Sequence, residues 1–117
     1  MVKFCKDHKI DVLTAPFGGS GDIQFKRIIE TPEELYGKGR VFSVATVPPG
    51  ASFGIHEHKG EEEFYCILSG TGEYYDNGEY VQVGPGDTTL CRSGEKHGMK
   101  NNGTEDLVYF ALIVYEN

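Results

Sequence analysis

Glycine is the residue that most constrains the fold of this chain. Sixteen of the 117 residues are glycine, about twice the usual share, and they lie singly or in pairs along the whole sequence. No low-complexity or proline-rich stretch interrupts them, so the sequence shows no domain boundary. Glycines spaced in this way mark many turns between short runs, which is typical of an all-β domain.

The runs between the turns predict at least eight short strands. Most of these runs alternate apolar and polar residues or are rich in Val and Phe, as strands are. Asn77-Gly78 separates two such runs and predicts a tight hairpin, because both residues of that turn need positive φ. We therefore expect a closed barrel or a jelly roll. The predicted strands cover residues 23–26, 40–47, 52–58, 63–68, 73–76, 79–83, 88–92 and 107–115.

The only helix signal lies in the run Thr31-Pro32-Glu33-Glu34. Thr31 is a good N-cap, Pro32 suits the first helical position, and Glu34 can reach back to complete a capping box. Gly37 follows and predicts that the helix ends within about two turns. One short helical turn is thus expected near the N-terminus of an otherwise all-β chain.

The chain is expected to form one domain preceded by an arm. Residues 1–22 are assigned to the arm, which could be exchanged between the subunits of a dimer, and residues 23–117 to the barrel. The longest apolar run, Leu107 to Tyr115, is far shorter than the roughly 20 residues that a membrane-spanning helix needs. Since the first residues also lack the apolar stretch of a signal peptide, we expect a cytoplasmic protein.

Charge argues against a nucleic-acid-binding protein, and cysteine content argues against a disulfide-rich or zinc-thiolate protein. Eleven basic and eighteen acidic residues give a net charge of −7, and such a surface repels the phosphate backbone of nucleic acids. Cys5, Cys66 and Cys91 are odd in number and form no CxxC pair, which argues against a disulfide framework or a thiolate zinc site. We expect reduced thiols and no nucleic-acid partner.

Three of the four histidines fall into one pattern with a glutamate. His56 and His58 are two residues apart, so in a strand they point to the same side. Glu63 opens the next predicted strand, and His97 lies in a turn-rich stretch after Gly94. Three neutral imidazoles and a carboxylate inside a barrel form a site for one divalent transition metal, with Fe, Mn, Ni, Co and Zn all suited to it. The alternative is that these histidines lie on the surface of an edge strand, beside an acidic loop.

Two spaced motifs around these residues resemble those of the cupin family. The first runs through Gly50, His56-Glu57-His58, Glu63 and Gly70, and the second through Gly86, Arg92, Gly94, His97 and Asn101. Arg92 stands where the family has a proline, and the other positions match. On these motifs the chain is identified as a small single-domain cupin of the conserved-barrel type.

The resemblance implies a double-stranded β-helix, the jelly-roll barrel of cupins, with the metal inside it. It also implies that the ligands are His56, His58, Glu63 and His97. Glu62 is the rival carboxylate, but strand alternation would point it outward if Glu63 points inward. Four protein ligands on a metal that prefers six leave about two positions for water or substrate, and open positions are typical of catalytic sites.

Two functional classes remain open. The first is a metal-dependent enzyme of the oxygenase or isomerase type that acts on a small polar molecule in the barrel. The alternative is a non-catalytic metal-containing module that binds or senses a small ligand. The lack of an acid–base pair beyond the metal ligands favours this second class.

Two residues are predicted to contact a substrate. Tyr65 shares the parity of Glu63, so we expect it to line the pocket, although an ordinary buried tyrosine is an equal alternative. Arg92 lies near the rim and could clamp a carboxylate or phosphate bidentately. A solvated charge at a strand end is the plainer interpretation of Arg92.

A homodimer is expected from the surplus of apolar surface. Leu107 to Tyr115 is apolar on both faces, and residues 40–47 are nearly so. One barrel covers only one face of each strand, and monomers rarely expose the other. The competing explanation is that the N-terminal segment around Ile10 and Phe17 folds back over that face.

Overall fold

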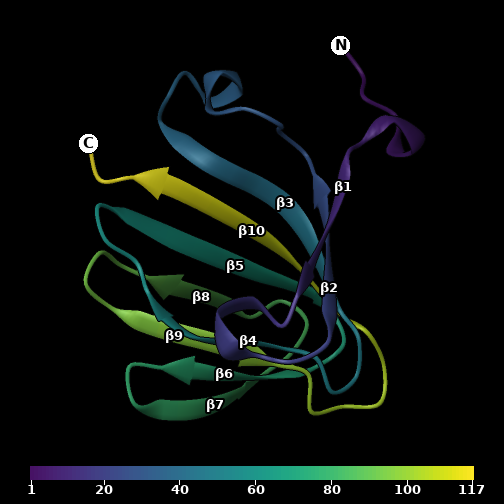
Figure 1. Ribbon diagram of the computed structural model, residues 1–117, viewed down its shortest axis with the longest axis vertical. Coiled ribbons are helices and arrows are strands. Elements are labelled where there is room, and N and C mark those ends of the chain that lie inside the picture. Colours follow the sequence, from purple (N-terminus) through teal and green to yellow (C-terminus); the bar gives the residue numbers. More distant parts are fainter.

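The computed structural model describes residues 1–117 and confirms the predicted all-β fold. Ten strands form two sheets that face each other as a double-stranded β-helix (Figure 1). The larger sheet has the order β1-β2-β3-β10-β5-β8, and the smaller one has the order β4-β9-β6-β7. The strands are β1 (Ile10–Thr14), β2 (Asp22–Arg27), β3 (Gly39–Val47), β4 (Ser52–Glu57), β5 (Glu61–Ser69), β6 (Gly72–Asp76), β7 (Glu79–Val83), β8 (Thr88–Cys91), β9 (Lys96–Lys100) and β10 (Leu107–Tyr115).

The core lies between the sheets and follows from alternation along the strands. In β10 every second residue from Leu107 to Ile113 is buried, while the residues between them are half-buried. The neighbouring strands bury the matching positions, such as Val47 in β3 and Tyr65 and Ile67 in β5. The predicted inward direction of Tyr65 is therefore confirmed, and Ile67 points the same way.

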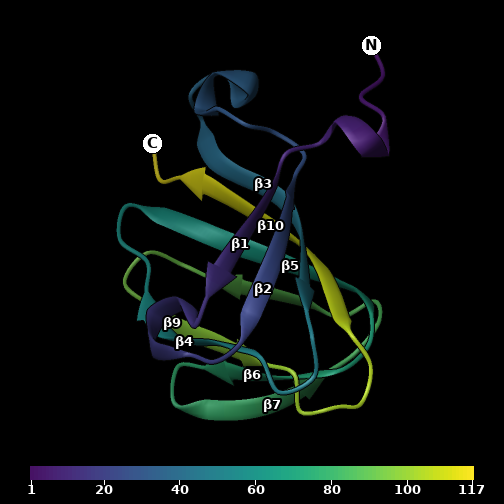
Figure 2. The same ribbon diagram turned by 45° about the vertical axis from the view of Figure 1, so that its right-hand side comes forward.

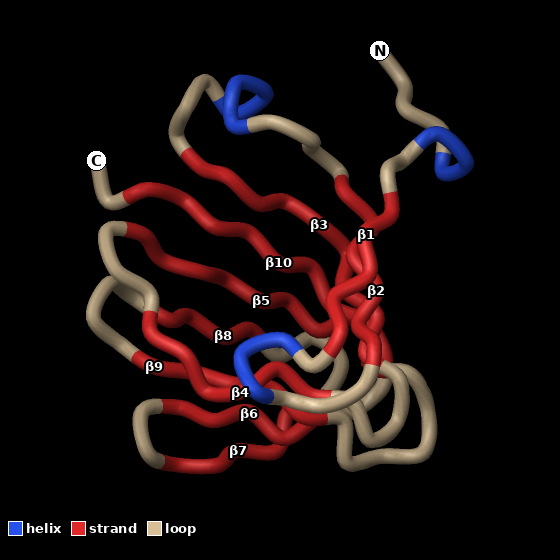
Figure 3. Tube along the Cα trace, in the orientation of Figure 1, coloured by secondary structure: helices blue, strands red, loops and turns tan.

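The N-terminal strand extends the larger sheet of its own chain. β1 pairs antiparallel with β2 along its whole length, and the two strands lie side by side at the sheet edge (Figure 2). The exchange of this arm between subunits stays a prediction. After β1 the chain passes through a 3-10 turn, η2 (Pro16–Gly18), which lies against β4 (Figure 3). Ala15 and Phe17 both have positive φ there, a conformation that costs roughly 1 kcal/mol or more in a residue other than glycine.

The helix signal at Thr31 produces a single 3-10 turn, η3 (Pro32–Leu35). Glu34 accepts the backbone N–H of Thr31 at 3.1 Å, as the capping box predicts. The turn is shorter than expected because Tyr36 adopts a left-handed conformation directly after it. The other helical turns are η1 (Cys5–Asp7) and η2, and no helix in the structure is long and apolar enough to cross a membrane.

The smaller sheet confirms one prediction and corrects another. β6 and β7 form the hairpin expected at Asn77-Gly78, where both residues have positive φ. His97, however, lies in strand β9 and not in a turn. The run Lys-His-Gly-Met-Lys has one strongly apolar residue, so no alternation is visible in it. Its pairing with β4 and β6 holds it in the sheet.

A β-bulge at the start of β3 turns Arg40 toward the barrel interior. The register of β3 against β10 includes Val41 and Gly39 but skips Arg40, which is therefore the extra residue. Its side chain reaches Glu61 on the inner side, because a bulge redirects a side chain away from simple alternation. Gly39 permits this approach, since a Cβ there would collide with the backbone oxygen of Ile113.

Candidate metal centre

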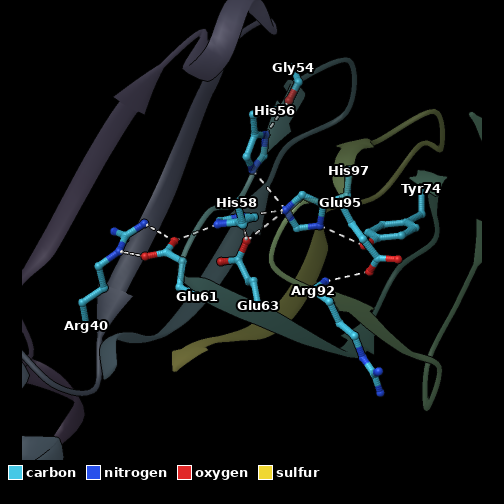
Figure 4. Close-up of polar contacts among 10 residues, drawn as sticks. All are labelled: Arg40, Gly54, His56, His58, Glu61, Glu63, Tyr74, Arg92, Glu95 and His97. Carbon is cyan, nitrogen blue, oxygen red and sulfur yellow. Dashed lines mark hydrogen bonds and ion pairs between the residues drawn. The ribbon is translucent and has the colours of Figure 1, made fainter. Parts of the chain in front are cut away.

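Four side chains from the two facing sheets converge in the barrel interior (Figure 4). His56 lies in β4 and His58 directly follows that strand, while Glu63 lies in β5 and His97 in β9. In the pairing of β4 with β9, His56 lies opposite His97. The four ligand atoms all lie within 4.8 Å of one another. This cluster, which is the one predicted, could hold one metal ion.

The distances between the four ligand atoms are those expected of atoms that bind one common ion. The Nε2 atom of His97 lies 3.0 Å from that of His58 and 3.1 Å from that of His56. The Oε1 atom of Glu63 lies 3.2 Å from the Nε2 atom of His58 and 3.1 Å from that of His97. Imidazole lone pairs repel one another at this range unless a proton or a cation lies between them. Three imidazoles and one carboxylate are a donor set that suits a divalent transition metal.

Each imidazole is held from behind through its Nδ1 atom. The Nδ1 atom of His56 lies 2.7 Å from the carbonyl oxygen of Gly54, and that of His97 lies 2.8 Å from the hydroxyl oxygen of Tyr74. The Nδ1 atom of His58 lies 2.7 Å from Oε2 of Glu61. With Nδ1–H donating to these oxygens, each Nε2 lone pair is left free for a metal.

Glu61 links His58 to Arg40, and sequence analysis assigned no role to either Arg40 or Glu61. Arg40 donates from Nε to Oε1 and from Nη2 to Oε2 of Glu61, both at 2.7 Å. These hydrogen bonds hold the pKa of Glu61 below its ordinary value, and they raise that of Arg40. The only local signal for this pair is the spacing of Glu61 three residues after His58. Arg40 had no signal, because the bulge that turns it inward is not visible in the sequence.

Burial and hydrogen bonds set the charge of the cluster. Burial opposes the charge of Glu63, but without a metal, hydrogen bonds from protonated Nε2 atoms of His58 and His97 outweigh it and bring the pKa of Glu63 to about 2. A bound metal would take the place of these Nε2 protons. The hydrogen bond that His58 donates to Glu63 is the main cause that raises the pKa of His58, whereas burial lowers that of His56. Glu63 is therefore an ionised ligand at neutral pH, and His56 is kept neutral, as metal binding requires.

A cavity of about 150 Å³ lies beside the cluster. It is smaller than the roughly 300–1,000 Å³ of pockets for drug-sized ligands, so it suits a small molecule. His56, His58 and Glu63 form part of its wall. Phe17 from η2 also lines it and stacks on the ring of His56, with a centroid distance of 4.1 Å. The rest of the lining is apolar except for Tyr65 and two arginines, Arg27 and Arg40.

The residues predicted to contact a substrate lie in different places. Tyr65 is buried, lines the cavity and stacks on His97 with a centroid distance of 5.2 Å. Arg92 is exposed, does not line the cavity, and its side chain points away from the cluster (Figure 4). Contact of either residue with a substrate stays a prediction. Cys91 is buried opposite Glu63 in the sheet, burial raises the pKa of its thiol to about 12, and it is not one of the four clustered residues.

Comparison with known proteins supports the interpretation of the two motifs. A curated relative, the "Oxalate-binding protein" of Thermotoga maritima, is 39% identical over 97 residues, which cover 83% of this chain and 79% of the relative. The crystal structure of a "predicted oxalate decarboxylase" from the same organism superposes with a TM-score of 0.93 at 35% identity, covering 98% of this chain and 99% of that one. The cupin domain of Schizosaccharomyces pombe Cnp3 shares the fold, with a TM-score of 0.72 at 16% identity over 91% of this chain and 69% of that one.

The family model described as "Cupin domain" matches residues 43–115, well over half of the chain, and includes all four residues of the cluster. Together with the double-stranded β-helix and the two motifs, this match shows that the chain belongs to the cupin family.

Proposed function

We propose that the chain binds one divalent transition metal through His56, His58, Glu63 and His97 and uses it to bind a small dicarboxylic acid. The observation that carries this proposal is the convergence of three Nε2 atoms and one carboxylate oxygen beside a small cavity. The relative named for oxalate binding supports the choice of acid. Oxalate is thus the first ligand to test.

The donor set explains why a short dicarboxylic acid fits. Four protein ligands on a metal that takes six leave about two positions open. The two carboxylates of oxalate offer two oxygens that can bind one cation together. A cavity of about 150 Å³ restricts the ligand to a small size, and its two arginines favour negative charge. Fe, Mn, Ni, Co and Zn all remain compatible with these ligands.

A metal-dependent enzyme acting on the same bound acid is the second candidate. The open metal positions favour it, because structural sites are usually closed by protein ligands. Proton transfer, which an isomerase needs, has little support from the cavity wall. Burial raises the pKa of Tyr65 well above 10, and Glu61 is already paired with Arg40 and His58. We therefore place binding ahead of turnover.

Calorimetric titration of the metal-stripped chain tests the proposal. Wild type is expected to bind one Mn(II) per chain, and the Mn(II)-loaded protein is expected to bind oxalate. His58→Ala should lose the binding of both Mn(II) and oxalate. His8→Ala, which alters a histidine outside the cluster, should keep metal binding. Wild type that binds no Mn(II), or oxalate binding that persists in His58→Ala, would overturn the proposal. Loss of oxalate from the metal-loaded sample over time would favour the enzyme.

We also propose that two copies of the chain pair through the outer face of the larger sheet. The half-buried or exposed apolar side chains on this face come from β3, β5 and β10, and they are Phe42, Val44, Phe64, Cys66, Phe110 and Leu112. β1 does not cover them, since it pairs edge to edge with β2. Two-fold pairing is the commonest way to bury such a face. Light scattering over a dilution series tests it, and a mass that stays near 12.9 kDa at high concentration would refute it.

A further inference from the structure

Two guanidinium groups stand on the cavity wall, apart from the four clustered ligands. Arg27 is the last residue of β2, and Arg40 is the bulge residue of β3. Both line the cavity beside the cluster, and their side chains are 24% and 45% exposed. Each is therefore accessible to a molecule that enters the cavity.

Arg27 is held in place by its neighbours, and most of its N–H donors have no partner in the chain. Its Nε–H donates to Oδ2 of Asp11 at 2.8 Å, and its guanidinium lies over the ring of Phe25 at 5.4 Å from the centroid. No other hydrogen bond of this chain uses its guanidinium. A guanidinium has five N–H donors, so the four on Nη1 and Nη2 remain for a ligand. An arginine held in this way loses little conformational entropy when it binds a carboxylate.

Arg40 is held similarly, by a different carboxylate. Its Nε and Nη2 donate to Glu61, which leaves Nη1 without a partner in the chain. Because Glu61 also orients His58, a change at Arg40 would affect the metal cluster as well. Arg27 has no such link to the four clustered ligands, so it is the residue at which the two effects can be separated.

A second hollow adjoins the cavity at these arginines. It has a volume of about 300 Å³ and shares Arg27, Arg40 and Val41 with the cavity. Lys9 adds a third cation to its wall, while Asp11 and Glu30 are its acids. Lys9 and Arg27 both pair with Asp11, and the three cations outnumber the two acids by one, which is a local exception in a chain with a net charge of −7. A ligand anchored at the cluster can thus extend between the two guanidinium groups.

We infer that Arg27 and Arg40 form an anion subsite that binds the far carboxylate of a dicarboxylic acid longer than oxalate, whose near carboxylate lies at the histidine–glutamate cluster. The inference rests on the proposed function for the near end of the ligand and extends it to a second contact. Paired arginines suit a carboxylate because their planar N–H groups match its two oxygens. The subsite thus selects for ligands with an anionic group at each end.

The test compares acids of increasing length on the Mn(II)-loaded chain. Oxalate, malonate, succinate and glutarate are titrated into wild type, Arg27→Met and Arg27→Lys, together with the monocarboxylates acetate and butyrate. We expect one of the longer dicarboxylates to bind wild type more tightly than the monocarboxylates do. Arg27→Met should weaken that binding about tenfold to a hundredfold, the usual value of hydrogen bonds to a charged group. Mn(II) affinity should stay unchanged, and oxalate, which is too short to span both ends, should lose much less affinity than the longer acid.

Arg92→Met is the matched control, because it removes an exposed arginine outside both hollows. Equal affinities of wild type and Arg27→Met for the whole series would overturn the subsite, and if oxalate still binds, the proposed function stands. Dependence of a longer acid on Arg27 without any oxalate binding would retain the subsite and remove oxalate as the ligand. If Arg27→Met fails to fold, the affinities of Arg27→Lys decide the test, since lysine keeps the positive charge but lacks the planar pair of N–H donors of a guanidinium. A loss of thermal stability in both variants with unchanged affinity would assign Arg27 to the ion pair with Asp11 alone.

Discussion

Glu61→Gln is the substitution that most directly tests how the metal centre is oriented. The carboxylate of Glu61 receives hydrogen bonds from Nε and Nη2 of Arg40, and Nδ1 of His58 lies 2.7 Å from the same Oε2 atom that Nη2 contacts. The side chain is only 12% exposed, so water cannot readily replace a lost partner. Glutamine has the same shape but only one acceptor oxygen, and its amide nitrogen must then face one of these donors.

Both orientations of the new amide are unfavourable. If its nitrogen faces His58, it donates to Nδ1 and moves the imidazole proton to Nε2, which removes the lone pair that a metal needs. If its oxygen faces His58, its amide nitrogen lies against Nε of Arg40. Two donors then face each other, and the hydrogen bond from Nε of Arg40 that holds this side chain in place is lost. Hydrogen bonds to charged groups contribute about 1.5–3 kcal/mol, and loss of such an outer partner weakens metal binding about 10- to 100-fold. We expect a rise of that size in the Kd for Mn(II).

Isothermal titration of the metal-stripped protein with Mn(II) measures this change. Glu62→Gln is the matched control, because it makes the same chemical change one residue away, at a position that faces Val114 outside the cluster. Thermal unfolding of both metal-free variants checks that they fold. A Kd equal to that of wild type in Glu61→Gln, or an equal loss in Glu62→Gln, would refute the reasoning.

Other consequences can be checked with standard methods. A chelator should lower the Tm, because a metal at a hundredfold excess over its Kd adds about 2.7 kcal/mol to the free energy of unfolding, and a scanning-calorimetry Tm unaffected by Mn(II) would contradict the site. Tyr74→Phe removes the partner of Nδ1 on His97, a neutral hydrogen bond of about 1 kcal/mol, so titration should show Mn(II) binding weakened about fivefold. Gly39→Ala places a Cβ against the backbone oxygen of Ile113 and should cost about 1–3 kcal/mol in urea unfolding, whereas an unchanged midpoint would show that the bulge adapts. Leu112→Lys puts a charge on the outer face of the larger sheet, and light scattering should then report a monomer where wild type forms a dimer.

Local signals predicted most of the fold, and together with the two motifs they predicted the four clustered residues. β7 and β10 have the predicted bounds, because alternation or a continuous apolar run between turn residues defines a strand without reference to its partners. His56 and His58 share a side for the same reason, whereas the choice of Glu63 over Glu62 depended on the first cupin motif, with which alternation in β5 agrees. His97 could be assigned to the cluster only through the spacing of the second motif, since its strand has no alternation.

The residues behind the four clustered side chains could not be predicted, because tertiary structure brings them there. Arg40 has the outward parity of Phe42, and only the bulge beside Gly39 reverses its direction. Phe17 reaches His56 from a glycine-rich loop whose backbone conformation does not follow from its composition. The glycine pattern likewise predicted that turns exist, but not which strands would become neighbours in the two sheets.

One part of the cavity wall is encoded in a stretch of the chain that holds none of the four clustered donors. Residues 10–27 supply Leu13, Phe17, Phe25 and Arg27 to the cavity wall, whereas the four clustered donors lie between residues 56 and 97. Mutations in the first stretch can therefore alter what the cavity accepts without touching a donor atom. For protein engineering, a library restricted to Leu13, Phe25 and Arg27, and leaving Phe17 in place on His56, would search for new ligand preferences on a constant metal centre. For natural divergence, the same separation lets a lineage acquire new ligands through its N-terminal segment while the cluster is retained.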